Sequence, residues 1–179
     1  MKVKLIAAIN NLNGIGYQGG IPWYVKDDMQ LFSRLTKGTG NNAIVMGKNT
    51  WLSIGKPLPK RDSIVLSNSL PVTANTGLDI DNPSLQIGGK KENVYFVNTP
   101  KMVTDLCKRN NYTDLWVIGG QSIYNLFLDL NIVDECVITH IDDNSKCDRF
   151  FPKLDNSWDL SKRERLNETK HCVHYYNKD

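Results

Sequence analysis

The chain has 179 residues, of which 40% are hydrophobic and 23% charged, and its formal net charge is +3. These values are typical of a soluble globular protein, and the length fits one domain spanning residues 1–179. The few excess positive charges are scattered without forming a basic stripe, so we expect no nucleic-acid partner.

The four cysteines lie far apart and form no CxxC pair. They lack the usual zinc and dithiol signatures, so we expect no metal site and reduced thiols in the cytosol. No apolar stretch approaches the roughly 20 residues needed to cross a bilayer, so no membrane association is expected. We therefore expect a cytoplasmic protein, and we expect it to be a monomer.

The first predicted element is a buried strand over residues 3–9, whose apolar run is shorter than the roughly 7 to 15 residues of a signal core. The stretch NNLNGIGYQGGIPW, residues 10–23, follows as a loop with four glycines and a Pro-Trp exit. Such a loop can close over a ligand and carry Trp23 into a pocket wall, or it can be a surface connection. Composition alone leaves both possibilities open.

The first predicted helix covers residues 25–36 and has two aspartates in its first turn. Because residues three and four apart share a helix face, Asp28 lines up with the apolar Phe32 and Leu35. Asp27 points elsewhere and is expected only to favour the helix dipole. Burial among apolar groups raises a carboxyl pKa, so helix capping and proton handling are equally good explanations for Asp28.

Strands and helices alternate along the middle of the chain, which predicts an α/β sheet with helices packed on its faces. The remaining strands are predicted at 43–46, 63–66, 94–97, 115–118 and 133–140, and the remaining helices at 99–109 and 121–128. Residues 69–93 are rich in Gly, Asn, Asp and Pro and are predicted to form a long loop. Segments 158–165 and 171–176 are predicted to pair antiparallel at the edge of a mixed sheet.

Two predicted strands end in glycine directly before a helical segment, at Gly47 and at the pair Gly119 and Gly120. Each turn exposes helix N-terminal amides beside a residue without a side chain, so a phosphate can approach the backbone closely. Two such turns suit a pyrophosphate, whereas either one alone is more often structural. Lys48 adds a cation at the first turn, although an isolated lysine is usually a solvated surface residue.

Seven stretches occur in the order typical of one known family, along almost the entire chain. They are LIAAI at 5–9, GIGYQGGIPW at 14–23, DMQLF at 28–32, VMGKNTWLSIGKPLPKR at 45–61, VIGGQSIY at 117–124, ITHID at 138–142 and DRFFP at 148–152. With them the chain resembles dihydrofolate reductase, and the fourth stretch is the most specific. The resemblance implies a dihydrofolate-reductase-like α/β fold: a central mixed, mostly parallel sheet of about eight strands, an antiparallel C-terminal edge and flanking helices.

The resemblance further implies NADPH-dependent reduction of 7,8-dihydrofolate to 5,6,7,8-tetrahydrofolate. In this reaction a hydride passes from nicotinamide C4 to pterin C6, and N5 gains a proton. By position, Asp28 corresponds to the family's pocket carboxylate, which hydrogen-bonds the pterin and promotes N5 protonation through a water near Trp23. Thr139 would support Asp28 and the pterin amino group. A lone carboxylate suits this task because its two oxygens accept paired pterin donors.

The same motifs assign the rest of the site. The walls around the pterin and its benzoyl tail would be Ile6, Ala8, Met29, Phe32, Ile54 and Leu58, and Arg61 would bind the tail carboxylate as a fork unless it is only a surface arginine. The implied cofactor-binding residues are Ala8, Ile15, Gly16, Ile21, Gly47, Lys48, Asn49, Thr50, Leu66, Ser67, Asn68, Ile118, Gly119, Gly120, Gln121, Ser122, Ile123 and Tyr124. Of these, Ala8, Ile15, Ile21 and Tyr124 would contact the nicotinamide. The pyrophosphate would lie between the amides of residues 48–50 and 120–122, and the bond between the paired glycines would be cis.

One departure from the family pattern concerns the 2'-phosphate of the cofactor. Many members place an arginine after the paired glycines and a serine or arginine after the third strand. The corresponding neighbourhoods here hold Gln121, Ser122, Ser67 and Asn68. These four residues therefore do not by themselves predict a preference for NADPH over NADH. We hypothesise that Lys48, or the pair Lys90 and Lys91, binds the adenosine end.

Two alternatives remain open from the sequence. One is a pyrimidine reductase of the riboflavin pathway with the same fold, which would share the cofactor end but is not expected to combine Asp28 with Arg61. The other is a binding module that kept the fold and lost turnover, because function depends on the site and not on the fold. The combination of Asp28, Arg61, Trp23 and Thr139 in one chain argues against it.

Overall fold

The computed structural model describes residues 1–69, 84–87 and 90–179. The strands are β1 Lys2–Ile9, β2 Gly14–Gly16, β3 Ala43–Gly47, β4 Asp62–Leu66, β5 Ser84–Ile87, β6 Lys90–Val97, β7 Asp114–Val117, β8 Glu135–His140, β9 Arg149–Phe150, β10 Trp158–Arg165 and β11 Cys172–Lys178. The helices are α1 Lys26–Lys37, α2 Lys48–Ile54, α3 Pro100–Asn110 and α4 Gln121–Asp129.

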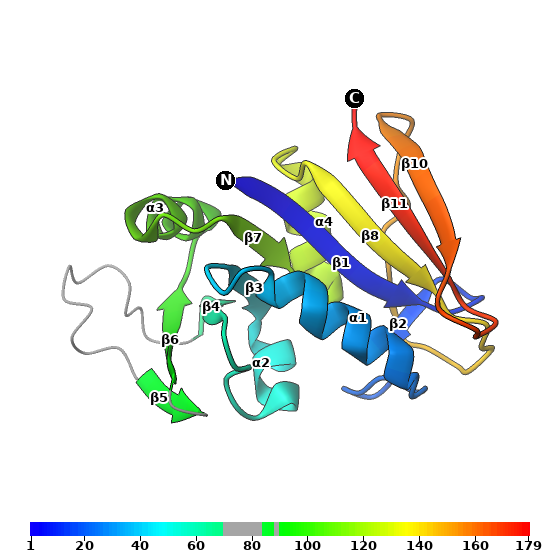
Figure 1. The fold of residues 1–179 in the computed structure, drawn as a ribbon, viewed down its shortest axis with the longest axis horizontal. Helices are drawn as coiled ribbons and strands as arrows, with labels where there is room; N and C mark the ends of the chain where they lie inside the picture. The colour runs from blue at the N-terminus through cyan, green and yellow to red at the C-terminus, as the bar shows by residue number, and fades with distance from the viewer. Residues whose placement is uncertain (70–83, 88–89) are drawn as a thin grey trace.

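Nine strands form one twisted sheet in the order β10-β11-β8-β1-β7-β3-β4-β6-β5, and β2 pairs with β9 apart from it (Figure 1). The strands from β8 to β6 in this order are parallel, whereas β11, β10 and β5 run antiparallel to their neighbours. The predicted mixed, mostly parallel sheet with an antiparallel C-terminal edge is therefore confirmed. In the part of the chain that the structure describes, no helix is both long and apolar enough to span a membrane.

The prediction of one long loop over residues 69–93 was wrong in part. Residues 84–87 form β5 and pair antiparallel with the first half of β6, so the sheet has one strand more than expected. An edge strand hydrogen-bonds to only one neighbour, so the four residues SLQI, of which only Leu85 and Ile87 are apolar, can form it without the longer apolar run of a buried strand. The rest of the predicted loop, residues 70–83 and 88–89, lies outside the described residues.

Local sequence signals explain where the helices begin and end. The Thr99 hydroxyl accepts a hydrogen bond from the Met102 amide at 3.2 Å, and Pro100 opens the first turn of α3. That helix ends at Asn111, whose left-handed φ of 54° is tolerated by asparagine. Gly38 ends α1 in a similar way, with φ of 51°. These ends fix which helix residues face the sheet.

The core has two layers, one on each face of the sheet. On one face α3 and α4 bury Val103, Leu106, Ile123 and Phe127 against the strands. On the other face, α1 and α2 pack against a second cluster that contains Leu31 and, at its margin, Phe32, Leu35, Trp51 and Ile54. Because side chains alternate along β1, Leu5 belongs to the first layer and Ile6 to the second. The second layer supports the helix that carries Asp28.

A pair of histidines lies on the α4 side of the sheet, where β8 and β11 meet. The rings of His140 and His174 are 3.9 Å apart between centroids, with Tyr176 beside them. Burial, followed by repulsion from His140 and from Arg163 on β10, lowers the pKa of His174 to about 4. Burial and the charge of Arg163 also lower the pKa of His140. Both rings are therefore neutral at pH 7.

We expect this pair to make folding stability fall in acid. Because the folded-state pKa of His174 is about 4 and an unfolded histidine titrates near 6.5, the unfolded chain binds more protons between these values. Stability is thus complete above about pH 6.5 and declines as the pH falls toward 4. The raised pKa of Asp28 acts in the opposite direction. Urea midpoints at pH 5 and pH 7.5 should differ less in His174→Phe than in the wild type, and an equal difference would contradict the assignment.

Candidate active site

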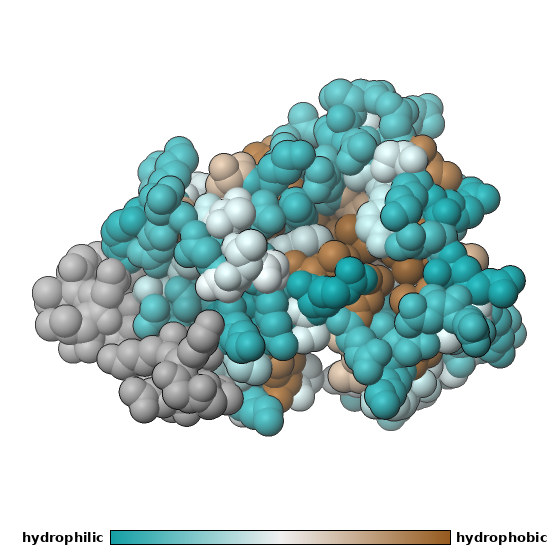
Figure 2. All heavy atoms as spheres, in the orientation of Figure 1, coloured by the Kyte–Doolittle hydropathy of each residue, from teal (hydrophilic) through white to brown (hydrophobic). Residues whose placement is uncertain are grey.

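The carboxyl ends of the parallel strands β1, β7, β3 and β4 lie side by side. Ligands of open α/β sheets bind at this kind of edge. α1 and α2 flank it on one face, and α4 begins at it on the other (Figure 1). Figure 2 shows apolar atoms beside a hollow at the lower margin of the molecule, where Figure 1 places α2. The candidate site is built around this edge.

Asp28 lies in the first turn of α1 and is half-buried. Its helix neighbours Phe32 and Leu35 pack against the second core layer, as their shared face predicted. Burial raises the pKa of the Asp28 carboxyl above its usual range, while the nearby Thr139 hydroxyl and His171 imidazole oppose the shift. The side chain is thus a carboxyl group that holds its proton more readily than an exposed aspartate does.

Thr139 lies on β8, directly beside Ala8 of β1, and is 1% exposed. Its hydroxyl is close enough to Asp28 to lower the pKa of that carboxyl. The two groups nevertheless fall short of ordinary hydrogen-bond geometry, because among the described residues the buried Oγ1 of Thr139 has no hydrogen-bond partner. A buried hydroxyl left in this state costs about 1–3 kcal/mol. It is therefore suited to a polar ligand group that also reaches Asp28.

The two glycine turns predicted from the sequence lie against each other. The Gly47 amide donates to the Gly119 carbonyl at 2.9 Å, and the peptide bond from Gly119 to Gly120 is cis. A Cβ on Gly120 would lie 3.6 Å from Oγ1 of Thr50, so the beginnings of α2 and α4 face each other across a narrow gap. A Cβ on Gly119, where φ is 116°, would lie 3.1 Å from the Tyr124 ring. Larger residues at Gly119 or Gly120 would fill the gap between the two glycine turns, which we call the cradle.

Tyr124 joins the cradle to the first strand. Its buried hydroxyl lies 2.8 Å from the carbonyl oxygen of Ile6 and 2.9 Å from that of Ile118. Its ring packs edge-on against Phe151, with centroids 5.2 Å apart. Burial raises the pKa of the phenol, so the group stays protonated and keeps donating. The Tyr124 hydroxyl thereby links β1 to the residue that follows β7.

The loop over residues 10–23 is tied to a segment far along the chain. Its strand β2 pairs with β9, the Asp148 amide donates to the Gly16 carbonyl at 2.9 Å, and the Gln18 amide donates to the Asp148 carboxylate at 3.0 Å. Trp23 at the end of the loop is half-buried, whereas Ile21 is 66% exposed. The loop is therefore an anchored segment beside the site and not an independent surface connection.

Comparison with known proteins agrees with this geometry. The family model described as dihydrofolate reductase matches residues 2–178. The chain belongs to the dihydrofolate reductase family. It is 33% identical to a putative dihydrofolate reductase of Caenorhabditis elegans, over 94% of this chain and 85% of that protein. It is 30% identical to the dihydrofolate reductase of Drosophila melanogaster, over 88% and 83%, and 32% identical to that of Schistosoma mansoni, over 93% and 85%.

Membership in the dihydrofolate reductase family marks the chain as an oxidoreductase, and its fold is the one that the resemblance implied. The structure brings the proposed substrate residues to one side of the sheet: Ile6 is buried, Ala8, Phe32, Ile54 and Leu58 are half-buried, and Met29 is 56% exposed. Arg61 is not a surface arginine, since it is 4% exposed. Its guanidinium donates to the Thr36 hydroxyl and to the Pro59 carbonyl, each at 2.9 Å.

The proposed cofactor residues lie along the strand ends in sheet order. Ile15 packs against the first core layer, Gly119 follows β7, and Gly47 ends the neighbouring strand β3. Ser67 is half-buried after β4, and Asn68 and Ser122 are exposed. Of the remaining members, Leu66 and Ile123 are buried and Asn49 is exposed. The others are half-buried: Gly16, Lys48, Thr50, Ile118 and Gln121. The Lys90 and Lys91 backbone forms part of β6, but their side chains lie outside the described part of the chain.

Three contacts beside the site were not foreseen from the sequence, although Gln121 itself had been assigned to the cofactor. Asp148 fastens the loop, Gln121 accepts a hydrogen bond from the Phe150 amide at 2.8 Å, and Ser69 lies within 3.2 Å of Lys48. The motif DRFFP contained the first of these, but it gave no sign of the partner. Each contact joins segments that are distant along the chain or lie at the edge of the predicted loop, so local periodicity cannot reveal it.

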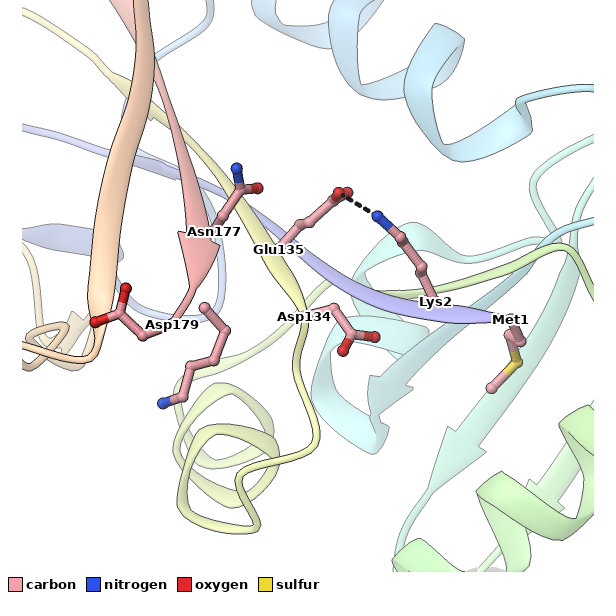
Figure 3. Close-up of a pocket in the computed structure, with 7 residues that line it drawn as sticks. Met1, Lys2, Asp134, Glu135, Asn177 and Asp179 are labelled. Atoms are coloured by element: carbon pink, nitrogen blue, oxygen red, sulfur yellow. Dashed lines mark hydrogen bonds and ion pairs between the residues drawn. The ribbon is translucent and has the colours of Figure 1, made fainter.

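A second depression lies at the opposite end of the sheet, where β1 and β8 begin and β11 ends (Figure 3). Its lining is mainly charged or polar: Lys2, Asp134, Glu135, Asn177, Lys178 and Asp179, with Met1 at the margin. Lys2 pairs with Glu135 at 2.9 Å. The depression lies at the amino ends of the central strands and has no wall of apolar side chains. It therefore does not suit a flat heterocycle.

Proposed function

We propose that the protein reduces 7,8-dihydrofolate to 5,6,7,8-tetrahydrofolate with NADPH. The observation that carries the proposal is the half-buried Asp28 carboxyl, with a raised pKa, beside the unpartnered buried hydroxyl of Thr139. Thr139 lies near the carboxyl end of β8, at the same edge of the sheet as the glycine turns. Family membership favours this reaction over that of a pyrimidine reductase from the riboflavin pathway.

Asp28 would bind the pterin through paired hydrogen bonds, with its two oxygens accepting from an amino group and a ring nitrogen. The Thr139 hydroxyl would complete the contact with the amino group. Because burial raises the pKa of Asp28, the carboxyl holds a proton more readily than an exposed aspartate does and would promote protonation at pterin N5, through a water beside Trp23. Assistance of this kind contributes roughly 10² to 10⁴ in rate.

The cradle suits a dinucleotide, because the facing starts of α2 and α4 leave backbone amides near one another and no side chain on the paired glycines. NADPH would supply the hydride. Ala8, Ile15, Ile21 and Tyr124 would orient the nicotinamide, and the amides of residues 48–50 and 120–122 would bind the pyrophosphate. The remaining proposed contacts are those of Ile118 and Ile123 with the nicotinamide half, and of Leu66, Ser67 and Asn68 with the adenosine.

The substrate tail would run along the groove between α1 and α2. Met29, Phe32, Ile54 and Leu58 would cover the benzoyl group. Arg61, whose guanidinium donates to the Thr36 hydroxyl and to the Pro59 carbonyl, would bind the glutamate carboxylate as a fork. Two anchored contacts turn a flexible arginine into a fixed fork, so little of its freedom is lost on binding.

One assay separates this proposal from its alternatives. Purified protein is mixed with NADPH and 7,8-dihydrofolate, and the loss of the near-ultraviolet absorbance of the nicotinamide is followed. Oxidation that requires dihydrofolate supports the proposal. Oxidation that requires instead an aminopyrimidine ribitol substrate indicates the riboflavin reductase, and binding of both compounds without oxidation indicates a non-catalytic module.

We expect the loop to depend on Asp148. Asp148→Ala removes the acceptor of the Gln18 amide, a hydrogen bond to a charged group. Amide exchange at residues 16–18 should accelerate about tenfold, and kcat should fall several-fold because the loop shields the site less well.

The matched control is Asp105→Ala, which removes an exposed carboxylate that pairs with Lys101 on α3. It should change neither the exchange at residues 16–18 nor kcat. Unaltered exchange in Asp148→Ala would show that the loop is held by other contacts.

A further inference from the structure

A buried asparagine, Asn42, lies where the chain passes from the end of α1 into β3 (Figure 1). Its Nδ2 donates to the carbonyl of Thr36, in the last turn of α1, at 3.0 Å. Its Oδ1 accepts from the amide of Asp114, the first residue of β7, at 3.1 Å. This side chain therefore joins the end of a helix to the start of a central strand.

The contact with Thr36 satisfies a group that the helix leaves open. The last four carbonyls of an α-helix have no partner within the helix, and the carbonyl of Thr36 is one of them. Asn42 supplies the donor that water would supply at an exposed helix end. Gly38, which ends α1, leaves room for this donor, because a Cβ there would lie 2.6 Å from Nδ2 of Asn42. The last turn of α1 is therefore held by this asparagine.

That last turn carries the hydroxyl that contacts Arg61. The Thr36 hydroxyl donates its only proton to the Phe32 carbonyl at 2.7 Å, so its oxygen is left to accept from the Arg61 guanidinium at 2.9 Å. The backbone carbonyl of Asn42 accepts from the amide of Asp62, the residue that follows Arg61, at 3.2 Å. Asn42 thus contacts both the residue that orients the guanidinium and the backbone next to Arg61.

We propose that Asn42 is a positioning residue for the substrate tail, which it serves by holding Thr36 and Arg61 in place. The inference rests on the proposed function, in which Arg61 binds the glutamate carboxylate. Without the donor from Asn42, the last turn of α1 would turn the Thr36 carbonyl toward water, and the hydroxyl of the same residue would move away from the guanidinium. The fork would lose its orientation, whereas Asp28, in the first turn of α1, would keep its place.

The test compares two substrates that differ only in the tail: 7,8-dihydrofolate carries the glutamate and 7,8-dihydropteroate does not. Asn42→Ala should raise the KM for dihydrofolate about tenfold, the factor expected for losing one hydrogen bond to a charged group. It should leave kcat and the KM for dihydropteroate nearly unchanged. Asn42→Asp keeps the acceptor for the Asp114 amide but loses the donor to Thr36, so it should give the same selective rise.

A second measurement follows Arg61 without turnover. Its Nε–H group donates to the Pro59 carbonyl at 2.9 Å, so the nitrogen-15 NMR signal of this group should be sharp in the wild type. In Asn42→Ala and Asn42→Asp the signal should shift and broaden, and amide exchange at residues 36–38 should accelerate. Thermal unfolding of each variant verifies that it is folded.

Asn41→Ala is the matched control, because Asn41 precedes Asn42 but its exposed side chain donates to the Asn111 carbonyl and the Thr113 hydroxyl. It should change neither KM nor the Arg61 signal. An equal rise in KM for both substrates in the Asn42 variants would overturn the proposal, because Asn42 would then support the site as a whole. An unchanged ratio of the two KM values would overturn it as well.

The outcome is separable from that of the proposed function. If the wild type reduces dihydrofolate and the Asn42 variants keep its ratio of KM values and its Arg61 signal, only the role of Asn42 fails. If the wild type reduces neither substrate, the proposed function fails, and the NMR signal of Arg61 still decides whether Asn42 positions the guanidinium.

Discussion

Replacing Asp28 with asparagine is expected to lower kcat about 10² to 10⁴-fold at neutral pH, with the fold and cofactor binding intact. Asparagine keeps the size of the side chain but cannot hold the proton or accept two hydrogen bonds from the pterin. If only proton supply is lost, activity should recover partly in acid, where the pterin can take a proton from solvent. The pH profile of kcat with saturating NADPH measures this.

The adjacent Asp27 supplies the control, because it lies in the same turn but on a different face of the helix. Asp27→Asn should have nearly wild-type kcat and the same pH profile. Full activity in Asp28→Asn would refute the role assigned to this carboxyl. An essential Asp27 would mean that the helix presents the other aspartate to the substrate.

Replacing Arg61 with lysine is expected to raise the KM for dihydrofolate about 10²-fold with little change in kcat. Lysine keeps the positive charge but loses the planar fork, and it cannot donate to Thr36, to the Pro59 carbonyl and to two carboxylate oxygens together. Each lost hydrogen bond to a charged group costs about 1.5–3 kcal/mol. Because the tail lies away from the reacting atoms, the loss should appear in KM.

A truncated substrate tests whether the effect comes from the tail. With 7,8-dihydropteroate, which lacks the glutamate, the wild type and Arg61→Lys should have similar KM values. Lys56→Met removes an exposed cation five positions earlier in the chain and should leave the KM for dihydrofolate nearly unchanged. An equal rise in Lys56→Met would mean that Arg61 acts through the general field of the surface and not as a fork.

Patterns that repeat within one element predicted the fold well. The apolar runs located the parallel strands, and the 3.6-residue period placed Phe32 and Leu35 on the core side of α1 together with Asp28. Thr99 and Pro100 marked the start of α3, where the cap hydrogen bond is present. Such signals are local because each arises from the geometry of a single helix or strand.

Contacts between distant segments were not predictable in this way. The hydrogen bonds of Asp148 to the loop and of Gln121 to Phe150 join parts of the chain that only the folded sheet brings together. β5 was missed because its four residues are too few to give a clear strand pattern within a stretch rich in Gly, Asn, Asp and Pro, and Ser69 because it stands at the start of the stretch read as a loop. The roles of the site residues remain predictions for the experiments above.

The hydrogen bond from the Phe150 amide to the Gln121 side chain has a mechanical consequence. Gln121 opens α4 immediately after the paired glycines, and Phe150 belongs to β9, which holds β2. The loop that contains β2 and the glycine turn before α4 are thus linked through this one hydrogen bond. A substitution that loosens either segment should also displace the other, so a redesign has to vary both together.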